Sequence, residues 1–168
     1  NFGQQEEFTI SMDIYPVYSE GIQVIIDYSH GGNSNWVIQR LGDIWNFKGV
    51  EFLLEYEQWQ HLVIVYNYGD ITILVNDNII AESSGHHISF NGSNNLYLGN
   101  WPEGGRRFNG IFDNLYISTN DRLLNGNLIS DNFLLDEYTF VYYNFNTGSG
   151  DILYDLSGND NHGIIHGA

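Results

Sequence analysis

Apolar and polar residues alternate along much of this chain, and that period of two constrains the fold more than any other feature of the sequence. In residues 8–14 one face of an extended segment is apolar and the other is polar. Such alternation is typical of strands that bury one face. Residues 22–27 repeat the pattern, and residues 34–47 and 49–56 are predicted to form two more strands. The apolar face of the first segment comprises Phe8, Ile10, Met12 and Ile14, opposite Thr9, Ser11 and Asp13.

Residues 61–83 give the clearest local prediction. Three apolar runs are separated by residues 67–70 and 76–78, which are rich in Asn, Asp and Gly. These residue types tolerate the positive φ angles of tight hairpin turns. The sequence therefore predicts a three-stranded antiparallel meander here.

Downstream, residues 94–101 and 108–119 are predicted to form two further strands, with a loop at Gly104 and Gly105. Only residues 122–135 have any helical character, enough for a short turn. Short strands at a spacing of about ten residues predict an all-β fold, a two-sheet antiparallel sandwich or jelly roll. We expect the 168 residues to form a single domain with one core.

The charge balance narrows the classes of partner. The chain has 21 acidic and 5 basic side chains, a formal net charge of -16. Such a surface repels phosphate backbones and anionic lipids, which argues against nucleic acid and membrane surfaces. Cations, neutral glycans and basic protein patches remain as partners.

Two absences from the sequence add further expectations. No Cys is present, so disulfides and thiol chemistry are excluded. No apolar run of about 18 residues suggests membrane insertion, and the N-terminus lacks the pattern of a signal peptide. We expect either a mature or excised fragment or a chain that does not use that secretion route.

Five segments, in this order and spacing, resemble laminin-G-like jelly-roll domains of the concanavalin A-like lectin/glucanase superfamily. The most recognisable is the Trp-x-His-apolar strand that starts at Trp59. The resemblance covers most of the chain and implies the sandwich fold. It also implies functions found on that fold, which range from glycan-binding modules and adhesins to structural proteins of viruses. The segments are FTISMDIYP from Phe8, WQHLVIVYN from Trp59, ITILVNDNIIA from Ile71, LYLGNW from Leu96 and FNGIFDNLYIS from Phe108.

The C-terminal segment, residues 139–168, resembles the beginning of such a domain. Two explanations are open. In a circular permutation, residues 140–146 would pair with the strand at residues 111–119 and the core would be preserved. In a tandem array cut mid-domain, a strand would be missing before Phe8, leaving an open sheet edge for self-association.

A calcium ion is one candidate ligand. The loop from Asp155 to Asn161 alternates short carboxylates, amides and carbonyls, including Ser157 and Asn159, and hard cations take about six to eight oxygen ligands. Related domains hold calcium with this kind of loop and an acidic residue that corresponds to Asp113, so the resemblance implies Asp155 and Asp113 as ligands. The alternative for the loop is an Asx-type turn. Asp113 itself faces inward if Ile111 and Leu115 do, and outward if Phe112 and Tyr116 are the buried set.

For ligand contact we select a predicted loop that contains Trp101, Arg106 and Arg107. A loop Trp can stack on a sugar while Arg donates hydrogen bonds. Trp45 and His30 are predicted to line a neighbouring loop. The alternative is that these rings close the ends of the sandwich. Trp36 and Trp59 are predicted to lie in the core.

Enzymatic activity is not expected. Glu51, Glu55 and Glu57 share a strand face, but they lack the Glu-x-Asp-x-x-Glu order of the family's retaining glucanases. The sequence thus favours a non-catalytic module that recognises a glycan or glycoprotein, with a structural calcium ion. The alternative is a structural, assembly or adhesion domain that acts through protein–protein contacts. Either role implies an extracellular, cell-surface or virion-surface location.

Overall fold

The described chain folds into β-strands joined by turns and loops. The computed structural model describes residues 6–30, 33–88, 94–124, 127–128, 135–146 and 149–167. Within these ranges every regular element is a strand, and no helix is long and apolar enough to cross a membrane.

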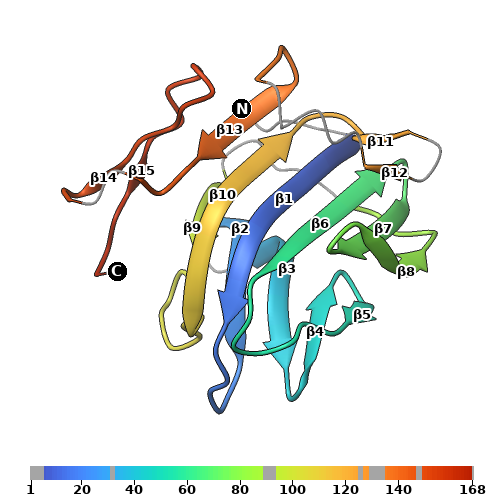
Figure 1. Cartoon of the computed structure of the whole chain (residues 1–168), viewed down its shortest axis with the longest axis horizontal. Coiled ribbons are helices and arrows are strands. Elements are labelled where there is room, and N and C mark those ends of the chain that lie inside the picture. The colour runs from blue at the N-terminus through green and yellow to red at the C-terminus, as the bar shows by residue number, and fades with distance from the viewer. Residues whose placement is uncertain are drawn as a thin grey trace.

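Two antiparallel sheets pack face to face, as predicted (Figure 1). The larger sheet has six strands in the order β13 (Thr139–Tyr143), β10 (Gly110–Ser118), β1 (Glu7–Pro16), β6 (Gln60–Asn67), β7 (Asp70–Val75) and β8 (Asn78–Ser83). The smaller has five, in the order β5 (Val50–Phe52), β4 (Ile44–Phe47), β3 (Asn33–Leu41), β2 (Gln23–His30) and β9 (Asn95–Leu98). Two short pairs are separate from the sheets: β11 (Leu123–Leu124) with β12 (Asn127–Leu128), and β14 (Ile152–Leu153) with β15 (Gly163–Ile164).

Aromatic rings from both sheets fill the space between them. Phe8 of β1 stacks on Trp36 of β3 at a centroid distance of 5.8 Å and on Tyr66 of β6 at 5.3 Å. Trp36 in turn stacks on Tyr28 at 5.4 Å. The four apolar residues of β1 predicted to face inward are all buried, which confirms the alternation read from the sequence.

The outer face of the six-stranded sheet is covered over only part of its area. Thr9 lies on that face yet is fully buried, and its hydroxyl donates to the carbonyl of Asn120 at 2.9 Å. Leu123 and Leu128 pack over β6 and β7 on the same face. The other end of the face, around Asp13, is partly open to solvent. This open end supplies the site described below.

The meander at residues 61–83 is confirmed as β6, β7 and β8. Its turns use positive φ angles, 46° at Tyr68 and 101° at Gly69 in the first, and 49° at Asn76 in the second. One other expectation was wrong. Residues 34–47 form two strands, β3 and β4, because Gly42, with φ of 65°, reverses the chain between them. Residues 123–124 pair with residues 127–128 as β11 and β12, and most of the stretch predicted to contain a short helical turn, residues 122–135, lies outside the described residues.

The C-terminal strand β13 closes one end of the large sheet. It pairs antiparallel with β10, placing Val141 opposite Ile117 and Tyr143 opposite Leu115. This is the pairing that the permuted order requires. The permutation itself, and the alternative of a tandem array, stay predictions.

Candidate functional site

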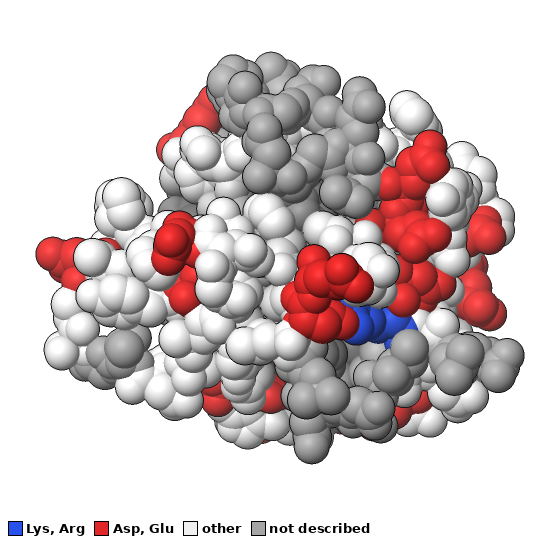
Figure 2. All heavy atoms as spheres, turned by 90° about the horizontal axis from the view of Figure 1, so that it is seen from above, with Lys and Arg blue, Asp and Glu red and all other residues white. Residues whose placement is uncertain are grey.

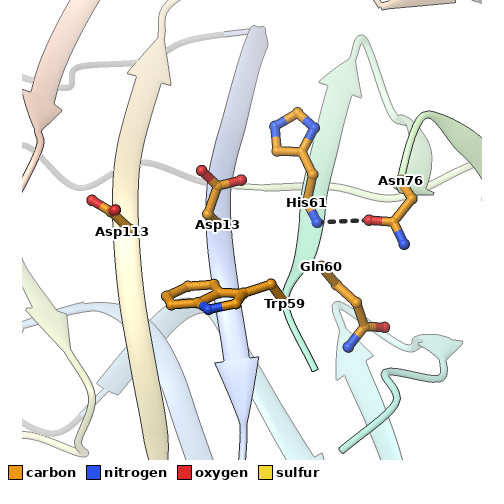
Figure 3. Close-up of a pocket in the computed structure, with 6 residues that line it drawn as sticks. All are labelled: Asp13, Trp59, Gln60, His61, Asn76 and Asp113. Atoms are coloured by element: carbon orange, nitrogen blue, oxygen red, sulfur yellow. Dashed lines mark hydrogen bonds between the residues drawn. The ribbon is translucent and has the colours of Figure 1, made fainter. Parts of the chain in front are cut away.

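Three polar side chains form a row across neighbouring strands on the open outer face. Asp13 of β1 lies directly opposite Asp113 of β10 on one side and His61 of β6 on the other. Because successive side chains of a strand point to opposite faces, the burial of Met12 and Ile14 in the core directs Asp13 outward. Figure 3 shows the row, with Asp113, Asp13 and His61 on three adjacent strands.

A β-bulge decides the orientation of Asp113. The register shifts between Ser11 and Asp13, and Asn114 opposite this step has a φ of 48°. An extra residue in one strand reverses the alternation beyond it, so Phe112 and Leu115 both pack against the core. Asp113 therefore faces outward, as in one of the two alternatives left open by the sequence.

Asn114 holds both carboxylates of the row. Its backbone N–H donates to Oδ1 of Asp113 at 2.8 Å, and its side-chain amide donates to Oδ2 of Asp13 at 2.9 Å. The hydroxyl of Tyr142 donates to Oδ1 of Asn114 at 3.3 Å. The two acidic side chains are thus positioned by neutral hydrogen-bond donors.

Trp59 forms the apolar side of this site. Its side chain is 49% exposed, although the sequence predicts it in the core, because it precedes β6 and lies outside the alternating part of that strand. The ring contacts Tyr15 edge-on at a centroid distance of 5.7 Å. In Figure 3 it extends across β1 next to Asp13. A cavity of about 350 Å³, here called the Trp59 pocket, is lined by Asp13, Trp59, Gln60, His61, Asn76 and Asp113.

His61 is fixed at the edge of the Trp59 pocket. Its backbone N–H donates to Oδ1 of Asn76 at 2.9 Å, which ties β6 to the turn after β7. Its ring Nε2 lies 2.7 Å from the hydroxyl of Ser11, and Nδ1 lies 3.6 Å from a carboxylate oxygen of Asp77. These contacts give the pocket one preorganised wall of polar groups.

The Trp59 pocket is acidic. It is lined by two carboxylates and by no Lys or Arg. Elsewhere, Arg122 pairs with Asp136 at 2.7 Å, and Arg40 is buried against backbone carbonyls. Figure 2 shows one face of the molecule, on which carboxylates are spread widely and basic side chains appear at one place. The local charge therefore has the sign of the whole chain.

The predicted loop around Trp101 brings two of its three selected residues together. The guanidinium of Arg106 lies 4.0 Å from the centre of the Trp101 ring, a cation–π contact. Arg107 is exposed, and the backbone carbonyl of Arg106 accepts a hydrogen bond from Val24 at 2.9 Å. Because Arg106 occupies one face of the ring, Trp101 can offer a ligand only its other face.

The prediction for Trp45 was wrong. Its side chain is 0% exposed, because residues 44–47 form a central strand whose inward face includes Trp45 and Phe47. The ring packs against Phe108 at 6.1 Å. His30 is the last residue of β2, and its side chain lies outside the described part of the structure. Trp36 lies in the core as predicted.

The loop predicted to hold calcium is folded around its own backbone. Asp155 is 6% exposed, and its carboxylate accepts hydrogen bonds from the N–H groups of Tyr142, Ser157 and Asn161 at 2.9–3.0 Å. The Ser157 hydroxyl adds a fourth at 2.8 Å. The Asn159 amide donates to the carbonyl of Thr139 at 2.7 Å. This is the Asx-type turn that the sequence left as the alternative.

This arrangement does not fit a cation at Asp155, because hydrogen-bond donors surround both carboxylate oxygens. Asp113 lines the Trp59 pocket and does not join the loop. Within the described ranges, no three His, Cys, Asp or Glu residues are grouped closely enough to hold a metal ion between them. Calcium therefore stays a prediction of the resemblance.

Burial raises the pKa of Asp155, but the hydrogen bonds from Tyr142, Ser157 and Asn161 outweigh that effect, and the pKa is lowered overall. Burial likewise raises the pKa of Tyr143 to about 12, with a further contribution from the nearby Asp155 charge. The Tyr143 hydroxyl donates to the carbonyl of Asn161 at 2.5 Å. Both groups hold the C-terminal loop against β13.

Most of the Trp59 pocket was missed from the sequence. Asp13 was placed on the polar face of its strand, and Asp113 was considered only as a metal ligand. The available signal was a Trp two residues before His61, at the start of a predicted strand. A large aromatic residue just before a strand is not part of the alternating pattern that buries every second side chain of the strand.

Two antiparallel sheets stacked through apolar inner faces define a jelly-roll domain of the concanavalin A-like class. The family model described as the concanavalin A-like lectin/glucanases superfamily, a laminin-G type, matches residues 1–129. The chain belongs to this family. No curated protein sequence matches the chain closely enough to count as a relative.

Solved structures share this fold at low sequence identity. A candidate carbohydrate-binding protein from Bacteroides ovatus has a TM-score of 0.72 and 20% identity, over 94% of this chain and 51% of its own. A heptameric pentraxin from Limulus polyphemus has a TM-score of 0.55 and 15% identity, over 73% of this chain and 67% of its own. Botulinum neurotoxin type C, described as dependent on two ganglioside molecules for cell entry, has a TM-score of 0.54 and 18% identity, over 74% and 34%. The chain thus spans about half the length of the Bacteroides ovatus protein.

Proposed function

We propose that this domain is a non-catalytic glycan-binding module whose ligand occupies the Trp59 pocket. The observation that carries the proposal is the half-exposed Trp59 ring beside the outward row of Asp13, Asp113 and His61. An exposed aromatic ring together with converging polar groups is the usual composition of a small-ligand site.

Each part of the Trp59 pocket has a role in this proposal. The ring offers an apolar face of the kind that stacks on the C–H face of a sugar. The carboxylates of Asp13 and Asp113 accept hydrogen bonds from hydroxyl groups, and such charged acceptors make the stronger bonds. The cavity, at about 350 Å³, lies within the range of about 300–1,000 Å³ found for small-ligand sites.

Family and fold support glycan recognition as the function. The chain belongs to a superfamily of lectins and glucanases, and the Bacteroides ovatus structure with the same fold is a candidate carbohydrate-binding protein. Binding without turnover is favoured because Glu51, Glu55 and Glu57 lack the Glu-x-Asp-x-x-Glu order of the family's retaining glucanases.

Substitution of Trp59 tests the proposal. We expect Trp59→Ala to weaken glycan binding at least fivefold, since stacking on an aromatic ring contributes about 1 kcal/mol or more. A glycan array identifies ligands of the parent protein, and titration calorimetry then measures both proteins.

Trp101→Ala is the matched control for this measurement, because Trp101 is the other partly exposed Trp and lies in a different loop. Loss of binding in Trp101→Ala alone would move the site to the loop selected from the sequence. Absence of any glycan ligand for the parent protein would overturn the proposal.

A second candidate function is assembly through a sheet edge. β8 ends the six-stranded sheet, and no described strand pairs with its outer side. It exposes Ile79 and Ile80, at 42% and 43%. Unpaired edges of this kind pair readily with other chains. A stable oligomer in sedimentation would favour assembly, and a monomer with glycan affinity would count against it.

A further inference from the structure

The Trp59 pocket contains a repulsion that its neutral donors do not remove. Asp13 and Asp113 lie directly opposite each other on adjacent antiparallel strands. Residues so placed have Cβ atoms about 4.5–5.5 Å apart, and like charges in that position destabilise a sheet. The amide groups of Asn114 orient both carboxylates but carry no charge.

The surroundings supply little positive charge to this pair. Among the described residues that line the pocket, His61 alone has a basic side chain. Its ring nitrogens contact the hydroxyl of Ser11 and the carboxylate of Asp77, an acidic side chain outside the pair. The formal net charge of -16 adds a long-range field of the same sign.

Trp59 provides the second attraction for a cation. Indole rings attract ammonium groups within about 6 Å of the ring centre, more strongly than other aromatic rings. Half of the Trp59 side chain is accessible, and in Figure 3 its ring lies across β1 next to Asp13, on the side away from the carboxylate oxygens. A saccharide that spans both would contact the ring and the carboxylates.

We propose that the Trp59 pocket selects a saccharide that carries a protonated amine, such as a glucosamine unit without its N-acetyl group. The inference rests on the proposed glycan-binding function and adds the charge of the ligand. The ammonium group lies between Asp13 and Asp113 and relieves their repulsion. The apolar face of the same sugar ring stacks on Trp59.

Matched oligosaccharides test this selectivity. The probes are a β-linked glucosamine tetramer, its fully N-acetylated form and a glucose tetramer, titrated by calorimetry at about pH 6, where carboxylates and amines are charged. We expect the glucosamine tetramer to bind at least tenfold more tightly than the other two. Asp13→Asn and Asp113→Asn should each reduce that preference about tenfold, the usual effect of losing a charge-assisted hydrogen bond.

Glu51→Gln is the control for charge alone. It removes one negative charge from an exposed position of β5, in the other sheet. If Glu51→Gln weakens glucosamine binding as much as Asp13→Asn does, the attraction comes from net charge and the inference fails. Both Asn variants should melt no lower than the parent protein, because each removes one of two repelling charges.

The outcomes separate the inference from the proposed function. Equal binding of all three tetramers, or tighter binding of the acetylated one, overturns the charge selectivity and leaves glycan binding in place. Failure of every tetramer and every arrayed glycan to bind overturns both.

Discussion

At the scale of single residues, Asp155 shows how hydrogen-bond donors can hold a buried carboxylate within a loop. Four donors bond its two oxygens, three of them backbone N–H groups. Its own N–H donates to Nδ1 of His162 at 3.0 Å. A charged group in such a position contributes stability only while it stays ionised.

The lowered pKa of Asp155 predicts how stability depends on pH. The native state binds this proton less readily than the unfolded chain, so the stabilisation is complete above the ordinary pKa of 3.8 and is lost as pH falls through the lower native value. We expect Asp155→Asn to cost about 2–4 kcal/mol at pH 7, through unsatisfied buried groups. Its stability should also fall less steeply in acid than that of the parent protein.

Urea unfolding at several pH values between about 2 and 7 measures both effects. Asp151→Asn is the matched control, since Asp151 is an exposed carboxylate at the start of the same hairpin. Identical acid profiles for the parent protein and Asp155→Asn would contradict this account.

The residues of the site mark where sequence reasoning succeeded and where it failed. Alternation placed Asp13 on the outer face of β1 correctly, because burial of apolar neighbours determines it. The sequence predicted Trp45 at the surface and Trp59 in the core, and the structure has them the other way round. Both are large aromatics near strand ends, and only the hairpin at Gly42 and the start of β6 at Gln60 separate their environments. Those boundaries depend on tertiary pairing.

At the scale of elements, the bulge in β10 determines the character of the outer face. It lets Phe112 and Leu115 share the core although they are three residues apart, and this leaves Asp113 outside. For that reason, neither the odd-numbered nor the even-numbered residues of β10 face the core along the whole strand. A register shift follows from pairing with β1 and has no local marker except Asn114, a residue type that tolerates positive φ.

Substitutions at Asn114 test the role of the bulge. Asn114→Ala and Asn114→Gly both remove the hydrogen bonds to Asp13 and from Tyr142, but only Gly adopts the φ of 48° without steric cost. We expect Asn114→Ala to lose about 1–3 kcal/mol of unfolding free energy. Asn114→Gly should be more stable than Asn114→Ala by about 0.5–1 kcal/mol. Urea unfolding compares them, and equal losses would mean that the backbone angle contributes nothing.

At the scale of the whole molecule, the resemblance and the described hydrogen bonds make opposite predictions about calcium. A ligand that binds the native state raises the melting temperature by mass action. We expect the same melting temperature in calcium and in chelator, because the carboxylate of Asp155 is already surrounded by donors. A rise in calcium that is absent in Asp155→Asn would support the ion predicted from the sequence.

The fold as a whole was predictable, since alternation and turn residues act locally and repeat along the chain. The jelly-roll architecture and the 61–83 meander needed only those patterns. Prediction of the pocket would have required the register of three strands from distant parts of the sequence. Asp13 and Asp113, for example, are a hundred residues apart. No local pattern specifies such a meeting.

The pairing of β13 with β10 has a practical consequence for the boundaries of this domain. The family model ends at residue 129, so a chain shortened to that match would lack β13. Tyr142 would then no longer hold Asn114, and the strand that carries Asp113 would become the rim of the sheet. Anyone who dissects this protein for ligand studies should therefore keep residues 130–168, although the family model does not match them.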